Sequence, residues 1–300
     1  MRNWQNIIND FRMYLKLERS MSDNTCFAYV SDINKLVSYL EIHDINTLPD
    51  KITPDILTHF IEYIAEIGLS DKTQSRIISS VKAFYKYMII EDLIDKDPSA
   101  LIEAPKIGRK IPVVLSVAEI EKILLAIDVS IILGHRNRAI IEVLYGCGLR
   151  VSELINLKIS NIYFNEDYIR VIGKGDKQRL VPLGSAAKKE IGFYMQSFRN
   201  QMTPQKGHTD FLFLNRRGKQ LTRVMIFTIV KEACKSAEIE KNVSPHTFRH
   251  SFATHLIEGG ANLRIVQEML GHESITTTEI YTHINREYLR ETIIQFHPRS

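Results

Sequence analysis

The sequence predicts a mainly α-helical protein of two domains, the second of which contains one small antiparallel β-sheet. Apolar residues recur at helical spacing through most of the 300 residues, as in amphipathic helices. Residues 95–115 interrupt that spacing with three prolines and a glycine, which indicates a domain boundary. Residues 168–181 contain two runs of strand-forming residues around a glycine-flanked turn, the pattern of a β-hairpin.

The first domain is expected to be a bundle of helices. Its first apolar stripe runs from Ile7 to Leu15. The next three helices are expected to begin at Ser22, Thr53 and Ser70, because a hydroxyl side chain can cap the free N–H groups of a first turn. Thr53 is also followed by a proline, which suits the first helical position.

The break in the helical pattern sets the expected domain limits. The first domain is predicted at residues 1–94, the linker at 95–115 and the second domain at 116–300. The linker is rich in basic residues, which would suit a path along a phosphate backbone. A solvated connector explains that composition equally well. The basic linker residues are Lys106, Arg109 and Lys110.

The second domain is expected to be mainly helical. A capping box begins at Ser116, and the helical pattern continues to Leu157. Two strands are predicted at residues 168–172 and 178–181, and helices resume near Ser185 and continue almost to the end. The second domain is therefore expected to hold the sheet among its helices.

Composition limits the class of protein. No apolar run approaches the length of a membrane span, and the polar N-terminus excludes a secretory signal. The three cysteines Cys26, Cys147 and Cys234 are scattered, so neither a disulfide framework nor a cysteine zinc site is expected. A reducing cytoplasm fits this composition.

Charge is distributed unevenly along the chain. Residues 1–106 carry 12 Lys and Arg against 16 Asp and Glu, whereas the remaining residues carry 27 against 19. The second part is thus basic, with a net charge of +8, which favours a polyanionic partner such as nucleic acid.

The densest group of reactive side chains follows Ser244 and a proline, which together indicate a helix start. His246, Arg249 and His250 would then lie on one face of the first turns, where free N–H groups favour a phosphate. A zinc site formed by His246, His250 and His255 is the alternative. No carboxylate or cysteine ligand accompanies these histidines, so no metal site is predicted.

Other positions complete a set that suits phosphoryl transfer. Arg150 has Glu153 one turn later, either as an orienting partner or as an ordinary surface pair. Lys174, between two glycines of the hairpin turn, is either a solvated charge or a proton donor. Tyr281 follows His272 by nine residues, and its phenol would need cations to act as a nucleophile, since an unperturbed phenol has a pKa of about 10. Arginines in such a set replace the Mg²⁺ of other phosphoryl-transfer enzymes.

Several motifs together resemble the tyrosine recombinase (phage integrase) family, and within it the Xer-type branch. They are GLRVSEL, VIGKGDKQRLVPLG, HTFRHSFATHL, LGHESITTTEIYTH and the closing HPRS. The stretch SDKTQSRIISSVKAFYKYM and the linker PKIGRKIPVVLS also resemble that branch. The resemblance covers the whole chain. It implies a two-domain DNA clamp, with a SAM-like core-binding domain followed by a catalytic domain.

The resemblance implies site-specific cutting and rejoining of DNA. Arg150 and Arg249 would clamp the scissile phosphate, and Tyr281 would form a 3′-phosphotyrosyl link. Such an exchange of one phosphodiester for another needs no ATP, and neither a metal nor any other cofactor is expected.

Three further catalytic roles come from the same resemblance. Lys174 would protonate the departing 5′-oxygen, His246 would act as acid or base on the phosphate, and His272 would hold a phosphate oxygen.

Partners are also implied. Residues 284–296 form a short amphipathic stretch, which could simply pack onto its own domain. In the family, such a C-terminal tail docks onto a neighbouring protomer, which links a homo- or hetero-tetramer on two DNA sites. A second, related recombinase and a septal DNA translocase are expected partners of a protein that resolves chromosome dimers, whereas no membrane is. Further DNA contacts are expected from basic residues of the fourth helix, for which a solvated helix face is an equal explanation, and from those around residue 220. They are Lys72, Arg76, Lys82 and Lys86, and Arg216, Arg217, Lys219 and Arg223.

Other functions remain open at this point. A mobile-element integrase would share every catalytic residue. A type IB topoisomerase would relax DNA as a monomer, and a DNA-binding protein without catalysis would be indifferent to the loss of Tyr281. A zinc-dependent phosphoesterase would be inhibited by a chelator.

Overall fold

The computed structural model describes residues 3–105, 108, 112–131, 133–173, 177–271 and 283–300. Its contacts divide the chain into two compact units, Met1–Lys110 and Ile111–Ser300. This division falls within the stretch that the sequence marks as a linker. Each unit is described by itself below.

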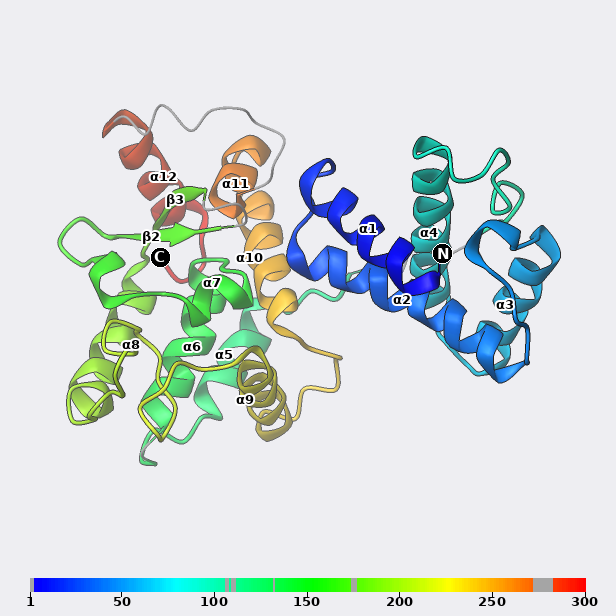
Figure 1. Cartoon of the computed structure of the whole chain (residues 1–300). Coiled ribbons are helices and arrows are strands. Elements are labelled where there is room, and N and C mark those ends of the chain that lie inside the picture. Colours follow the sequence, from blue (N-terminus) through cyan, green and yellow to red (C-terminus); the bar gives the residue numbers. More distant parts are fainter. Residues whose placement is uncertain (1–2, 106–107, 109–111, 132, 174–176, 272–282) are drawn as a thin grey trace. The chain divides into compact units, whose positions relative to one another are not determined.

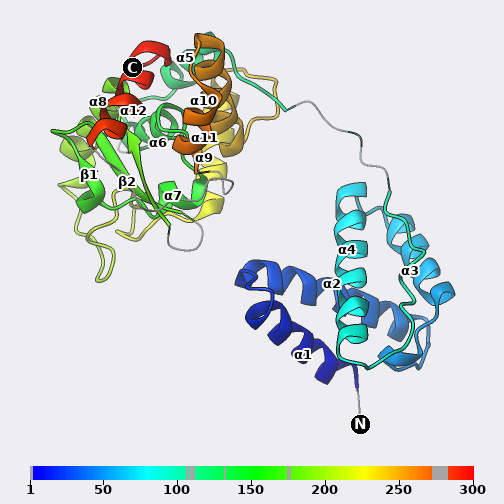
Figure 2. The ribbon, with the colours of Figure 1, turned by 90° about the horizontal axis from the view of Figure 1, so that it is seen from above.

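The first unit is a helical bundle (Figure 1). The N-caps of its second, third and fourth helices are Ser22, Thr53 and Ser70, which confirms the helix starts expected from the sequence. Helices α2 and α4 pack against each other and cross steeply in both Figure 1 and Figure 2. The helices are α1 (Trp4–Leu17), α2 (Asp23–Ile42), α3 (Pro54–Glu66) and α4 (Asp71–Ile90), with a short 3-10 turn at Pro49–Lys51.

Aromatic side chains fill the core of this unit. Phe11 of α1 and Phe84 of α4 are both fully buried and meet edge to face, with ring centroids 5.3 Å apart. Such contacts add to the burial of apolar area that stabilises a helical bundle.

The second unit combines helices with a three-stranded antiparallel sheet in the order β1-β2-β3. The sequence predicted β2 and β3, and the structure confirms them, with Val171 opposite Arg179. It did not predict β1, which is only two residues long. The strands are β1 (Ile162–Tyr163), β2 (Tyr168–Ile172) and β3 (Gln178–Pro182). The helices are α5 (Val117–Leu125), α6 (Gly134–Gly146), α7 (Val151–Ile155), α8 (Ser185–Tyr194), α9 (Arg223–Ser236), α10 (Pro245–Gly259), α11 (Leu263–Leu270) and α12 (His283–Phe296), with a 3-10 turn η2 (Ile159–Asn161) and a π-helical turn η4 (Met195–Arg199).

Helix α6 forms the centre of this unit. It is buried almost all round and packs against α8 and α10. Strand β3 contacts both α11 and α12, which lie on either side of it in Figure 1. The sheet therefore brings the predicted hairpin next to the two helices that border residues 272–282.

Gly148 fixes the turn between α6 and α7. Its φ of +58° lies in the left-handed region, and a Cβ there would be 2.5 Å from Cδ1 of Phe252 in α10. Only glycine combines that backbone conformation with so close an approach. The turn that leads into Arg150 thus packs directly against α10.

Replacing Gly148 by Ala should destabilise the second unit by about 2–4 kcal/mol, because left-handed strain and a steric clash add up. Urea unfolding measures this change. Gly192→Ala is the control, since Gly192 lies within α8 and its Cβ would meet nothing within 4 Å. That variant should stay within about 1 kcal/mol of the wild type. Equal stability of both variants would contradict the assigned role of Gly148.

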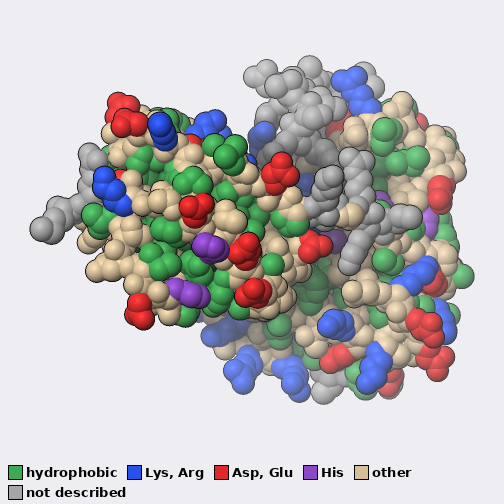
Figure 3. Space-filling view, turned by 90° about the vertical axis from the view of Figure 1, so that its right-hand side faces the viewer, with side chains coloured by type: hydrophobic (Ala, Val, Ile, Leu, Met, Phe, Trp, Pro, Cys, Tyr) green, Lys and Arg blue, Asp and Glu red, His purple; other side chains and the backbone are tan. Residues whose placement is uncertain are grey.

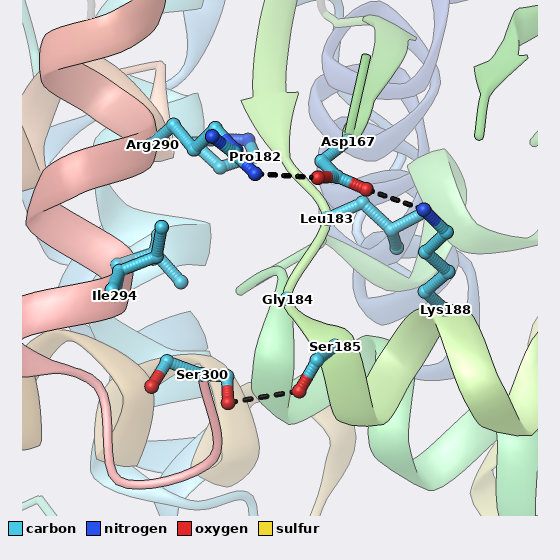
Figure 4. A pocket seen from close by; sticks show the side chains of 10 residues that line it. Asp167, Pro182, Leu183, Gly184, Ser185, Lys188, Arg290, Ile294 and Ser300 are labelled. Carbon is cyan, nitrogen blue, oxygen red and sulfur yellow. Dashed lines mark hydrogen bonds and ion pairs between the residues drawn. The ribbon is translucent and has the colours of Figure 1, made fainter. Parts of the chain in front are cut away.

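Helix α12 packs on its own unit in the single chain. Its residues Leu289 and Ile293 are buried in the core. Asp167 accepts a bond from Lys188 at 2.6 Å and one from Arg290 of α12 at 2.9 Å (Figure 4). These contacts border a cavity of about 210 Å³ between α12 and the start of α8. The docking of this tail onto a neighbour, which the sequence predicts, remains a prediction for the assembled protein.

His297 follows α12 and is buried against the rings of Tyr145 and Phe252. Burial, with smaller contributions from His255 and Arg299, lowers its pKa to about 3. A histidine whose pKa is lowered on folding stays neutral in the folded state while the unfolded state takes up a proton. Its stabilising effect is therefore complete above pH 6.5 and is lost as the pH falls toward 3.

Between pH 7.5 and pH 5, the free energy of unfolding should fall by about 2 kcal/mol more for the wild type than for His297→Phe. Thermal unfolding at both pH values measures the difference. The other buried titratable groups remain in both proteins, so their contributions cancel. Parallel pH profiles would show that His297 does not titrate in this way.

The surface of the molecule mixes apolar and charged side chains on the face that Figure 3 presents. Among the described residues, no helix is long and apolar enough to cross a membrane.

Candidate active site: an arginine cluster around Glu153

Glu153 is the centre of the site. It lies in the first turn of α7, and its side chain is only 2% exposed. One carboxylate oxygen accepts the backbone N–H of Arg150 at 2.8 Å, and the other accepts Nη1 of the same arginine at 2.9 Å. The pairing that the sequence indicated is confirmed. The surface-pair alternative is wrong, because the carboxylate is buried.

Arg249 approaches Glu153 from α10. Its side chain is 10% exposed and lies 3.9 Å from the carboxylate. Nη1 donates to the carbonyl of Gly148 at 2.8 Å, and Nη2 donates to that of Leu270 at 2.5 Å. Burial and the neighbouring Arg150 lower the pKa of Arg249 to about 9, although Glu153 opposes the shift.

Arg179 is a third member that the sequence did not reveal. It comes from β3, is 7% exposed, and holds both carboxylate oxygens of Glu153 at 2.7 and 2.8 Å. Its position on the strand offered one signal. It lies opposite Val171 and two residues before Val181, on the buried face of the sheet, where a charged residue needs a partner.

The end of α11 binds all three arginines. The carbonyls of residues 269, 270 and 271 each accept a bond from a different guanidinium. The donors are Nε of Arg179 at 2.8 Å, Nη2 of Arg249 and Nη2 of Arg150 at 3.0 Å. The last carbonyls of a helix lack intrahelical partners and carry partial negative charge. This end of α11 therefore supports three positive charges at once.

The cluster has a surplus of positive charge. Three guanidinium groups surround one carboxylate, so the net charge of the four side chains is about +2. Burial alone would raise the pKa of Glu153, but bonds from Arg179 and Arg150 outweigh it and lower that pKa. Arg150 is the most accessible of the three, with 35% of its side chain exposed. The cluster thus favours an anion on its open side, beside Arg150.

His246 lies at the start of α10, as the sequence predicts. Ser244 is the N-cap and a proline follows it. His246 and His250 are exposed, whereas His255 is buried and its Nδ1 pairs with the hydroxyl of Tyr145 at 2.8 Å. His255 is therefore a packing and orienting group of the core. In the described ranges, no three His, Cys, Asp or Glu side chains are grouped as metal ligands.

Three predicted catalytic residues, Lys174, His272 and Tyr281, lie outside the described residues. Of the other three predicted catalytic residues, Arg150 and Arg249 lie together around Glu153. His246 lies at the start of α10, the helix that carries Arg249.

The predicted DNA contacts differ in their surroundings. On α4, Lys72 and Lys86 are exposed and Lys82 is half-buried. Arg76 pairs with the fully buried Asp32 of α2, which also accepts the hydroxyl of Ser80 at 2.9 Å. Arg76 is therefore a link between two helices as well as a surface cation. The basic residues around residue 220 are exposed, and Lys106, Arg109 and Lys110 fall outside the described ranges.

Comparison with known proteins identifies the family. Residues 114–287 match the phage integrase family, and residues 8–92 match the phage integrase N-terminal SAM-like domain. The first match alone covers more than half of the chain. The chain belongs to the phage integrase family. It is accordingly a tyrosine recombinase, a DNA strand-exchange enzyme, and its mainly helical fold with a small antiparallel sheet is that of the family.

Relatives of this tyrosine recombinase match it over nearly its full length. Tyrosine recombinase XerD of Oceanobacillus iheyensis is 42% identical over 293 residues, covering 98% of both chains. XerD of Staphylococcus aureus is 40% identical over 296 residues, covering 99% of this chain and 100% of that protein.

Solved structures of recombinases also match this chain. XerA recombinase is 34% identical, with a TM-score of 0.51 and 99% of each chain covered. XerH site-specific recombinase bound to its difH substrate is 26% identical, with a TM-score of 0.68, covering 95% of this chain and 83% of that chain.

Proposed function

We propose that this tyrosine recombinase cuts duplex DNA at a specific site through Tyr281 and rejoins it to a second site. The observation that carries the proposal is the arginine cluster, which presents about two unmatched positive charges beside an accessible guanidinium. The phenol oxygen of Tyr281 attacks the scissile phosphorus, and the bond from phosphorus to the 5′-oxygen breaks. The phenol loses its proton, and the 5′-oxygen gains one. Rejoining reverses these changes with the 5′-hydroxyl of another strand.

Arg150 and Arg249 stabilise the charge that builds on the non-bridging oxygens. Their planar forks suit two oxygens of one phosphate, and the buried surroundings of Arg249 strengthen that attraction. A bound anion would also raise the lowered pKa of Arg249, because it would neutralise the positive charge that burial disfavours. Lys174, His246 and His272 serve as the proton donor, the acid or base and the phosphate contact.

The basic stripe of α4 provides a second DNA contact. Lys72, Arg76, Lys82 and Lys86 recur at intervals that place them on one side of the helix. Small residues at 75, 79 and 83 lie between them, which leaves room for a phosphate backbone. Such contacts supply affinity without sequence choice. The XerH structure is bound to DNA, which supports DNA as the partner of this chain too.

We place the reaction in chromosome dimer resolution at cell division. The XerD relatives of two bacteria, at about 40% identity over nearly the whole chain, support that assignment. In this role the protein acts in the cytoplasm as a homo- or hetero-tetramer on two DNA sites, with a second, related recombinase as the partner in the hetero-tetramer and a septal translocase as activator. In this assembly α12 would leave its own unit and dock onto a neighbour.

A plasmid with two target sites in direct repeat tests the function. The sites are those that the protein selects from sheared chromosomal DNA of its source. In EDTA and without ATP, the protein, with its partner recombinase if one is encoded, should form a covalent complex with the DNA at these sites, and with the septal translocase and ATP added it should resolve the plasmid into two circles. Specific binding without a covalent complex in any of these mixtures would refute strand cleavage, and a requirement for a divalent metal in forming that complex would refute the metal-free chemistry.

A further inference from the structure

Arg179 is buried but shares its carboxylate partner with Arg150. Both its terminal nitrogens bind Glu153, and its Nε binds the carbonyl of residue 269. With 7% of its side chain exposed, it is not placed to contact DNA. Its role must therefore be exerted through other residues of the site.

We propose that Arg179 is a positioning residue of strand exchange, which matches the charge of Glu153 and fixes the hairpin against the end of α11. This inference rests on the proposed function. Arg179 is the closest charged partner of Glu153, at 2.7 Å, and it holds both oxygens of the carboxylate. One buried negative charge is thus matched by one buried positive charge.

This match of charges leaves Arg150 and Arg249 available to bind the scissile phosphate. Without Arg179, the cations that the described part of the chain leaves to neutralise Glu153 would be Arg150 and Arg249, at 2.9 and 3.9 Å. A low-dielectric site makes that pairing strong, so Glu153 would compete with the scissile phosphate for both guanidinium groups. Arg179 therefore allows Glu153 to hold Arg150 in place and reduces its competition with the scissile phosphate for the two guanidinium groups.

Arg179 also links three elements of the site to one another. It comes from β3, binds α7 through Glu153 and binds the last turn of α11. Gly271 has a φ of +67°, and a Cβ there would lie 3.2 Å from Cδ of Arg179. A Cβ on Gly173 would lie 3.6 Å from Nη1 of the same arginine. Residues 174–176 and 272–282, with the predicted Lys174, His272 and Tyr281, follow directly on these two glycines.

The proposal depends on the forked shape of the side chain as well as on its charge. Lysine would keep one positive charge but could not bind both carboxylate oxygens and a carbonyl in one plane. Arg179→Lys is thus the informative variant. Arg199→Lys is the matched control, because Arg199 is also buried and binds the backbone carbonyls of residues 209 and 211.

The experiment measures how fast each full-length protein forms its covalent complex with a nicked target site. Two substrates are compared, one with an ordinary scissile phosphodiester and one with a methylphosphonate, which has lost the negative charge that arginines neutralise. Arg179→Lys should bind the ordinary site within about 3-fold of the wild type but cleave it roughly 100-fold more slowly, as expected for a misplaced catalytic group. On the methylphosphonate its defect should shrink to less than about 10-fold, while Arg199→Lys should resemble the wild type on both.

Two results would overturn the inference. One is cleavage of the ordinary site by Arg179→Lys at the wild-type rate. The other is an equal fold-loss on both substrates, which is what a smaller fraction of folded protein produces. A wild type that forms no covalent complex on either substrate would instead refute the proposed function, and the inference with it.

Discussion

Replacing Tyr281 by Phe should abolish the covalent complex between protein and DNA, while DNA binding remains within about 3-fold of the wild type. The variant lacks only the phenol oxygen that would bond to phosphorus, so its covalent yield should fall by more than roughly 10⁴-fold. A denaturing gel of radiolabelled, nicked target DNA measures the yield, and a gel shift measures binding.

Tyr288→Phe is the control for this change. Tyr288 lies on α12 and is 54% exposed, so the loss of its hydroxyl should leave the covalent yield unaltered. A normal yield from Tyr281→Phe, or its loss from Tyr288→Phe alone, would mean that the nucleophile has been assigned wrongly.

Arg249→Gln should slow covalent cleavage by about 10³-fold, because it removes a charged donor from the transition state in a buried site. It also leaves the carbonyls of Gly148 and Leu270 without their partner, which should cost about 1–3 kcal/mol of stability. Single-turnover cleavage and thermal unfolding measure the two effects separately.

The control for Arg249 is Arg136→Gln. Arg136 is equally buried and donates to the carbonyl of Leu214 at 3.0 Å, so its loss should lower stability similarly and leave cleavage within about 5-fold of the wild type. An equal loss of cleavage in both variants would mean that Arg249 acts only through folding.

Local features of the fold were predictable from the sequence. The caps at Ser22, Thr53 and Ser70 and the strands of the hairpin depend on residues close together in the chain. Strand β1 was not predicted, because two residues carry no measurable alternation. The packing of α12 on its own unit was left open, since an amphipathic pattern does not show which surface it covers.

The site was also predictable only in part, because a sequence pattern does not show which elements pack together. Arg150 and Glu153 are three residues apart, so their pairing could be expected. Arg179 reaches Glu153 across 26 residues, and the shared carbonyls lie still further along the chain. Its role depends on the strand face that it occupies and on the helix end opposite that face. Neither can be read from spacing alone.

Strand exchange should proceed through a phosphate ester on Tyr281. The most direct test is to trap the covalent complex in EDTA, digest its DNA and protein, and identify the modified peptide by mass spectrometry. We expect a phosphate-linked nucleotide on Tyr281. A nucleotide on another side chain, or no adduct from wild-type protein that binds and recombines the site, would contradict it.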